Sequence, residues 1–295
     1  MDKYMLTGIA VILTLAACER IKNDTKQDTI PEPDPGVFLQ ISGGFEYKYT
    51  DFDFYDSSAC IFYFKKVHAE LENLEGGVFV FLNNGDTIYI GSLWPPYMNS
   101  MPYGPFISTP PFFYQCYALK IENWYDVKPD PRNGSEMIEV LRSHGLLHSG
   151  LGISIDTVEI TADGLDFTFT ITNEDSTDLL ILDPEKTGSG LFHYFTNGLS
   201  LYTQDHIQVF SSNIESQAPI PWNSWSIDWL SELKSGDSVT FTIHYTPDAP
   251  LEPGEYQALF EFPGLGHAVA WDQPFQGDAR IWLGDVRAIK RILVP

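Results

Sequence analysis

The sequence contains two histidines at a spacing that helical zinc sites use. His144 and His148 are four residues apart, so a helix would place both imidazoles on one face. The zincin motif needs a glutamate directly after the first histidine as general base, and Gly145 stands there instead. Glycine also favours the end of a helix between the two ligands. We therefore expect two unrelated histidines at a helix end, and no metal site.

No catalytic nucleophile is evident. Ser189 lies in Gly188-Ser189-Gly190, whose glycines adjoin the serine directly, whereas the G-x-S-x-G elbow leaves one residue on each side. Its surroundings do not read as a strand followed by a helix, so we expect a flexible turn. With 40 acidic residues, some carboxylates must lie close together, but sequence spacing cannot identify a glycosidase pair. We expect no catalytic residue and no cofactor.

Aromatic side chains in the segment 94–114 are the first candidates for ligand binding. Proline is too frequent there for a central strand, so the segment is expected to form a long loop. Loops on rigid sheets commonly carry function, and Trp94, Tyr97 and Tyr103 could stack on sugar rings. The alternative is that these aromatics fold back onto the sheet or onto a second domain.

A row of tryptophans is the second candidate. Trp222, Trp225 and Trp229 recur at i, i+3 and i+7, which predicts one face of a short helix with Pro221 in its first turn. An exposed row would form a stacking platform for sugars, and a buried row would close one end of a core. Because large aromatics at helical spacing usually belong to a core, we favour that interpretation. The loop around His267 is expected to be a surface turn.

Composition restricts the class of protein. The chain has 295 residues, of which 43% are hydrophobic and 14% aromatic, enough for one large or two medium folded domains. The 40 acidic residues outweigh 17 basic ones and give a formal charge of −23. Such a surface would repel nucleic acids and anionic lipid headgroups, so neither is an expected partner. The acidity is expected to serve solubility outside the cytoplasm.

The first 18 residues determine the expected location. Lys3 precedes an apolar run from residue 5 to 17 that is shorter than the ~20 residues a membrane-spanning helix needs. Leu15-Ala16-Ala17-Cys18 resembles the lipobox of bacterial lipoproteins. The resemblance implies that residues 1–17 are a signal peptide. It also implies that Cys18 carries a diacylglyceryl group and an acyl chain such as palmitate, which together anchor it in a membrane. The alternative is a buried N-terminal helix.

The residue after the anchor bears on the choice of membrane. Glu19 stands where enterobacterial lipoproteins retained in the inner membrane carry aspartate, so the resemblance implies the outer membrane. Its periplasmic or external side stays open.

With Cys18 modified, Cys60 and Cys116 remain as a pair in apolar, strand-like surroundings. They form either a disulfide, which an oxidising envelope permits, or two buried free thiols.

The chain divides into regions that differ in composition and in expected secondary structure. Residues 18–36 are polar, with alternate prolines near their end, and are expected to form an extended tether. Residues 37–131 are expected to form a β-rich domain with a hairpin turn at Asn84-Gly85. Residues 132–150 are a helical connector, with a helix from Ser135 to His144 capped by Ser135 and stopped by Gly145. Strands in the β-rich domain are expected at 37–41, 45–49, 60–64, 77–82, 87–90 and 115–124.

Residues 151–295 show the clearest alternation of apolar and polar residues, which favours an antiparallel β-sandwich. The turns at 233–236 and 251–254 resemble those that lead into late strands of bacterial immunoglobulin-like domains. The expected fold is mostly β, with an immunoglobulin-like sandwich in the C-terminal half. Such a fold hosts many activities, so it implies no function. Strands are expected at 158–161, 165–173, 179–182, 198–202, 206–210, 239–245, 256–262 and 279–283.

These observations lead to one preferred function and two alternatives. We expect a lipid-anchored envelope protein that binds or scaffolds without catalysis, with a glycan or an envelope protein as its partner. A hydrolase with no recognisable motif is one alternative. A structural adhesin or surface-assembly subunit is the other.

Overall fold

The computed structural model describes residues 36–95, 97–100, 102–109, 117–123, 130–247, 250–265 and 275–294. The predicted signal peptide, Cys18 and nearly all of the predicted tether lie outside these residues, as do Cys116 and His267. No described helix has the length and hydrophobicity that crossing a membrane requires. Residues 34–295 form one compact unit. The described residues hold two α-helices and twenty strands, which confirms the prediction of a mostly β fold.

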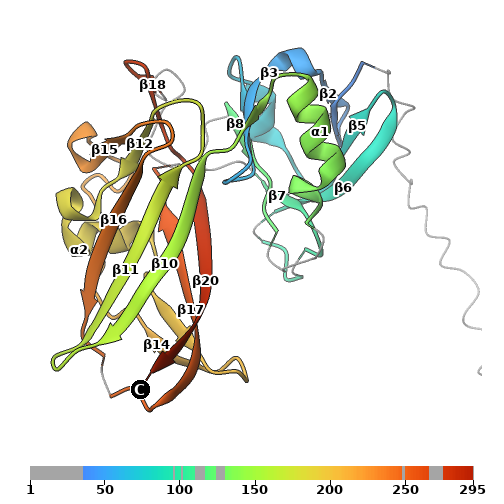
Figure 1. The fold of residues 1–295 in the computed structure, drawn as a ribbon. Helices are drawn as coiled ribbons and strands as arrows, with labels where there is room; N and C mark the ends of the chain where they lie inside the picture. Colours follow the sequence, from blue (N-terminus) through green and yellow to red (C-terminus); the bar gives the residue numbers. More distant parts are fainter. Residues whose placement is uncertain are drawn as a thin grey trace, which may run out of the picture. The chain divides into compact units, whose positions relative to one another are not determined.

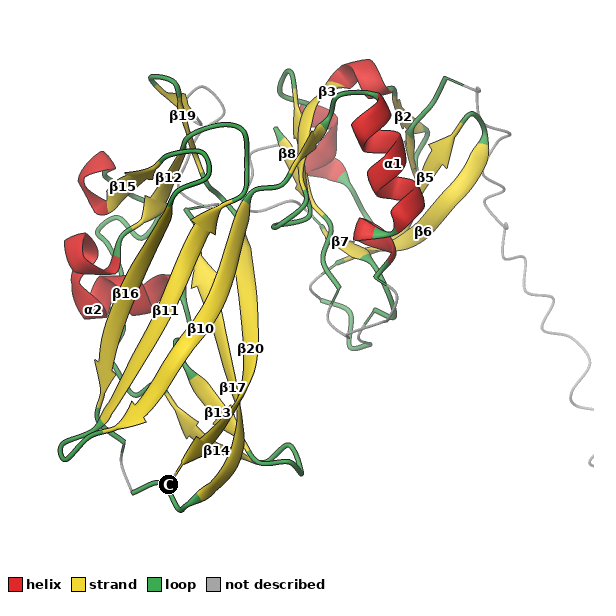
Figure 2. Ribbon diagram, viewed as in Figure 1, coloured by secondary structure: helices red, strands yellow, loops and turns green. Residues whose placement is uncertain are grey.

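The N-terminal β region consists of two sheets (Figures 1 and 2). One has the strand order β2-β1-β5-β6-β7 and the other the order β8-β4-β3-β9. Most pairs are antiparallel, and β6–β7 and β3–β9 are parallel. The bounds are β1 Leu39–Ile41, β2 Phe45–Tyr47, β3 Phe52–Asp56, β4 Ile61–Phe64, β5 Gly77–Asn83, β6 Asp86–Trp94, β7 Phe106–Ser108, β8 Ala118–Lys120 and β9 Leu147–His148.

The predicted hairpin turn at Asn84-Gly85 is confirmed. Asn83 pairs with Asp86 at the end of the β5–β6 ladder. Asn84 and Gly85 both have positive φ, at 52° and 90°. Two-residue hairpins need this backbone at both central positions, which explains the asparagine–glycine pair.

The core of this region is built from phenylalanines on facing strands. The Phe62 ring lies 5.9 Å from that of Phe38 and 4.9 Å from that of Phe81, measured between centroids. Helix α1 (Ser135–Ser143) contributes Met137 and Leu141 to the same core. Strands β1 and β4 are buried at every position, so these short strands lie inside an aromatic core.

Helix α1 occupies the position predicted for it, with one correction at its start. Gly134 is the N-cap and provides no side-chain cap, whereas Ser135, predicted as the cap, is the first helical residue. The helix ends before Gly145, whose φ of 68° is a left-handed conformation that glycine adopts easily.

Two antiparallel sheets pack face to face in the C-terminal half. One has the order β10-β11-β16 and the other the order β14-β13-β17-β20. Burial alternates along the whole of β11, and its Phe169 ring lies 4.6 Å from the Phe260 ring of β17. With these seven strands lettered A, B, C, C′, E, F and G, the sheets read A-B-E and C′-C-F-G, the immunoglobulin-like arrangement. The bounds are β10 Leu151–Ile160, β11 Leu165–Asn173, β13 Ser200–Tyr202, β14 Gln208–Ser211, β16 Ser238–Tyr245, β17 Gly254–Pro263 and β20 Asp285–Val294.

Further elements extend this sandwich. A third sheet has the order β15-β12-β19-β18. Helix α2 (Pro184–Phe195) begins at the N-cap Asp183, whose carboxylate accepts hydrogen bonds from the backbone N–H groups of Glu185 and Lys186. The sequence did not predict α2. The turn expected around Ser189 is replaced by a kink at Gly188 with helix on both sides. The strand bounds are β12 Leu179–Leu182, β15 Leu230–Leu233, β18 Phe275–Gln276 and β19 Ala279–Ile281.

Candidate functional site

The two histidines of the zinc spacing have separate surroundings. His144 lies at the C-cap of α1, where its ring stacks on that of Tyr49 with 3.7 Å between centroids. His148 lies on β9, and its Nδ1 is 2.8 Å from Asp175 Oδ1. Each imidazole is thus held by a different neighbour, and the helix that would have aligned them ends at Ser143.

Ser189 follows the kink of α2 at Gly188, whose φ is 71°. His193, one turn further on, places Nδ1 2.8 Å from the Ser189 carbonyl oxygen, and its Nε2 lies 3.1 Å from the Tyr245 hydroxyl. The Ser189–His193 contact therefore uses the backbone and not the serine hydroxyl. Burial lowers the pKa of His193 and favours its neutral form.

The tryptophan row is divided between core and surface. Residues 221–226 are not helical, and the predicted short helix is wrong: only the 3₁₀ turn Ile227–Trp229 forms. Trp225 and Trp229 pack against the sandwich core, as the core interpretation predicts. Trp222 is 59% exposed. A platform of three parallel indoles is therefore absent, because the turn directs the side chains differently from a helix.

The β6–β7 loop, residues 95–105, carries the most exposed aromatics among the described residues. Tyr97 is 78% exposed and Tyr103 87%. Met98 is also exposed, at 45%. Residues 96 and 101 of this loop lie outside the described part. The phenol rings of this loop present apolar faces and polar tips to solvent, which is the amphipathic character that sugar-binding aromatics need.

The base of the loop is held in place. Strands β6 and β7 pair in parallel, with Ser92 opposite Phe106 and Trp94 opposite Ser108. Trp94 is half-buried, and its indole Nε1 donates a hydrogen bond of 2.8 Å to the Ser100 carbonyl. Its ring also meets Phe106 edge-on at 5.9 Å. Trp94 therefore supports the loop, and of the three predicted aromatics of this loop only the two tyrosines face solvent.

A buried charge cluster that the sequence did not predict lies on β3 and β19 and in the turn after β11. Arg280 is 1% exposed, and its Nη2 lies 3.0 Å from Asp56 Oδ2 and 3.1 Å from Asp175 Oδ2. The guanidinium carbon also sits 4.8 Å from the centre of the Phe54 ring. Asp175 accepts in addition from His148. These contacts join strands from both β regions, so the cluster holds the fold together.

The ionisation of this cluster follows from its partners. Burial disfavours charge on Asp175, but His148 and Arg280 outweigh it and lower the pKa of this carboxyl to about 2. Burial likewise opposes charge on Arg280, whose pKa is nevertheless raised by Asp56, Tyr63 and Asp175. Asp175 and Arg280 are therefore both charged at neutral pH.

Cys60 is a buried free thiol, and burial raises its pKa. Its Sγ lies 3.8 Å from the Ser57 carbonyl oxygen and 3.7 Å from Asn133 Nδ2. A thiol of this kind behaves as a small apolar group. Cys116, the predicted disulfide partner of this thiol, lies outside the described residues.

Comparison with known proteins adds no relative: neither a protein-family model nor a curated protein matches this chain.

Proposed function

We propose that this chain is a lipid-anchored, non-catalytic binding protein of the bacterial cell envelope, and that the β6–β7 loop binds a glycan. The observation that carries the proposal is the exposure of Tyr97 and Tyr103, at 78% and 87%, on a loop fastened at its base. A rigid base lowers the entropy lost when a ligand orders the loop, so exposed aromatics there serve binding better than the same residues on a loose segment.

The anchor part of the proposal rests on the sequence. Cys18 follows Leu15-Ala16-Ala17, and the polar, proline-rich stretch to Gly36 provides a spacer before the folded unit. Double acylation gives stable membrane attachment. The outer membrane is the proposed location, with the acidic surface serving solubility.

A glycan-array screen of the full chain, purified in detergent, tests the binding part. We expect a specific hit that Tyr97→Ala and Tyr103→Ala each weaken about tenfold, the factor that ~1.4 kcal/mol of lost contact produces. Phe275→Ala is the matched control, because Phe275 is an exposed aromatic on β18, at 45%. Unchanged affinity in both tyrosine variants, or a loss confined to Trp222→Ala, would remove the loop from the proposal.

A second candidate, the assembly subunit, is favoured by one feature. Strand β14 is the last strand of its sheet, and Ile207 and Val209 beside and within it are 62% and 42% exposed. An edge strand with apolar side chains can pair with another chain. Analytical ultracentrifugation tests this candidate: it requires self-association that Val209→Lys abolishes, and a monomer at all concentrations contradicts it.

A further inference from the structure

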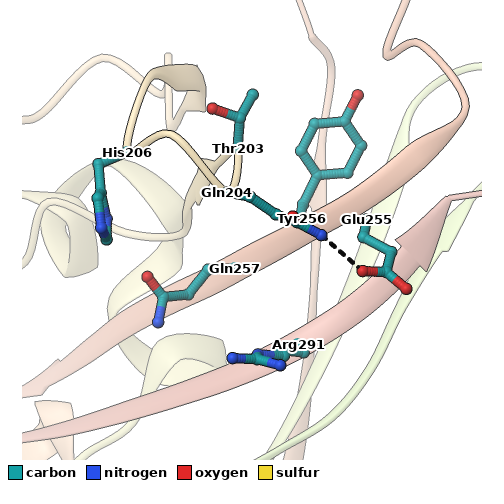
Figure 3. A pocket seen from close by; sticks show the side chains of 7 residues that line it. All are labelled: Thr203, Gln204, His206, Glu255, Tyr256, Gln257 and Arg291. Carbon is teal, nitrogen blue, oxygen red and sulfur yellow. Dashed lines mark hydrogen bonds between the residues drawn. The ribbon is translucent and has the colours of Figure 1, made fainter.

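A hollow with both polar and apolar lining lies on the outer face of the β14-β13-β17-β20 sheet. None of its lining residues belongs to the β6–β7 loop. The volume of the hollow is about 360 Å³, within the range of small-molecule sites. Figure 3 shows the side chains around it, which come from β17, from β20 and from the turn between β13 and β14. Thr203, Gln204, His206, Glu255, Gln257 and Arg291 provide its polar groups.

Arg291 is the distinctive group in this hollow. On the same face of the same two strands, Arg287 stands opposite Glu261 and forms an ion pair with it at 2.9 Å. Arg291 stands opposite Gln257, a neutral amide. The Arg291 side chain forms no ion pair or hydrogen bond with another of the described residues. An unmatched guanidinium is notable in a chain with 40 acidic and 17 basic residues.

The remaining groups suit a polyhydroxylated ligand. Gln204 Nε2 donates to Glu255 Oε2 at 2.8 Å, which fixes this carboxylate and leaves its other oxygen to accept from a ligand hydroxyl (Figure 3). Gln257 brings an amide with both a donor and an acceptor. The negative charge of Glu255 disfavours a ligand that carries several negative charges. A ligand with one negative group next to Arg291 and neutral hydroxyls elsewhere therefore fits the hollow best.

The turn that closes one side of the hollow is well fixed. Thr203 N donates to the Ile207 carbonyl at 2.9 Å, and His206 N donates to the Thr203 carbonyl at 3.0 Å. The Thr203 hydroxyl oxygen accepts from the Ile207 N–H at 3.2 Å. His206 has a φ of 61°, and its imidazole reaches the hollow from this turn. The polar groups are thus presented by a defined turn and two paired strands.

We propose that this hollow binds an acidic saccharide, with the carboxylate of a hexuronate on Arg291 and its ring hydroxyls on Gln257 and Glu255. Guanidinium and carboxylate can form two parallel charge-assisted hydrogen bonds, a geometry that a lysine or an amide does not provide. This site is independent of the β6–β7 loop and of the glycan proposed for that loop.

Ligand-observed NMR titration of the full chain in detergent tests the site. The probe is the methyl β-glycoside of glucuronic acid, and its control is methyl β-glucoside, which differs only in replacing the carboxylate by a hydroxymethyl group. We expect the glucuronoside to bind roughly tenfold more tightly, and Arg291→Gln to remove this difference. Arg287→Gln, the matched exposed variant on the same strand, should preserve it.

Several outcomes would overturn the proposal. Equal binding of the two glycosides, or no binding of either, excludes a carboxylate on Arg291. Acetate binding as tightly as the glucuronoside excludes the saccharide class. Loss of glucuronoside binding in Tyr97→Ala would move the ligand to the loop. Arg291→Lys keeps the positive charge but loses the paired guanidinium donors, so this variant is expected to bind the glucuronoside with intermediate affinity. Circular dichroism verifies that each variant is folded.

Discussion

Arg280 shows how one buried charge determines which substitutions of its neighbours the fold can tolerate. Its Nη2 pairs with Asp56 and Asp175, and all three side chains are almost fully buried. Its Nε and Nη1 are buried without a hydrogen-bond partner among the described residues. A buried pair contributes little beyond what an apolar replacement would give, but removing one partner leaves the others uncompensated. The cluster is therefore a site where single substitutions are costly and combined ones are mild.

Arg280→Met is expected to destabilise the protein by about 3–5 kcal/mol, because two carboxylates lose their counter-ion. Urea denaturation followed by tryptophan fluorescence measures this change. The triple variant Arg280→Met, Asp56→Asn, Asp175→Asn removes all three charges and should recover most of the loss. A single variant within 1 kcal/mol of the wild type would contradict the assigned role.

Asp175 also predicts a dependence of stability on pH. Its pKa is lowered from 3.8 to about 2 on folding, so the unfolded state binds the proton more readily. The carboxylate therefore stabilises the fold above pH 4, and this contribution, about 2 kcal/mol, is lost as pH falls from about 4 to 2. Denaturation of the wild type and of Asp175→Asn across this window should show a steeper decline in the wild type. Parallel declines would refute the assignment.

At the scale of elements, helix α2 illustrates a start signal that overrides poor helix propensity. Gly188 and Gly190 weaken the helix, yet Asp183 caps its first turn and Phe192 is buried in the sandwich core. Ser231 adds a hydrogen bond to the second Asp183 oxygen. The cap and the burial together fix a segment that propensity alone would leave irregular.

Asp183→Ala is expected to lower stability by about 1–2 kcal/mol through loss of the cap. Asp205→Ala is the matched control: Asp205 is exposed in the turn before β14, and its loss should stay within about 0.5 kcal/mol. Thermal unfolding of both variants gives the comparison. Equal losses of stability in the two variants would mean that the Asp183 cap does not stabilise α2.

At the scale of the whole molecule, the proposed anchor determines where the folded unit acts. Cys18→Ser should prevent lipidation and release the protein into the soluble fraction, because the acyl chains on Cys18 are its proposed membrane attachment. Membrane fractionation and incorporation of an alkyne-labelled palmitate measure the two effects. Cys60→Ser, which removes a thiol buried in the fold, is the control and should keep the label. Membrane retention without Cys18 would contradict the anchor.

Local patterns determined the elements whose signal lies along the chain. Strand β11 was predicted at its observed bounds because one of its faces is buried throughout, so apolar and polar residues alternate. Strand β20 was missed because its exposed face mixes charged residues with Ile289 and Leu293, and the alternation disappears. The exposed loop tyrosines could be proposed from sequence because prolines are frequent there, but the predicted loop 94–114 was too long, since strand β7 lies within it.

The sequence by itself determined the mostly β fold, the connector helix and the loop that carries Tyr97 and Tyr103, because periodicity, proline and glycine act over a few residues. Only the tertiary structure decided that Arg280 meets Asp56, 224 residues away, and that Arg291 faces a glutamine where Arg287 faces a glutamate. It also decided that the three tryptophans separate. Contacts of this kind depend on strand register and sheet order, which arise from packing of the whole core and leave no local pattern in the chain.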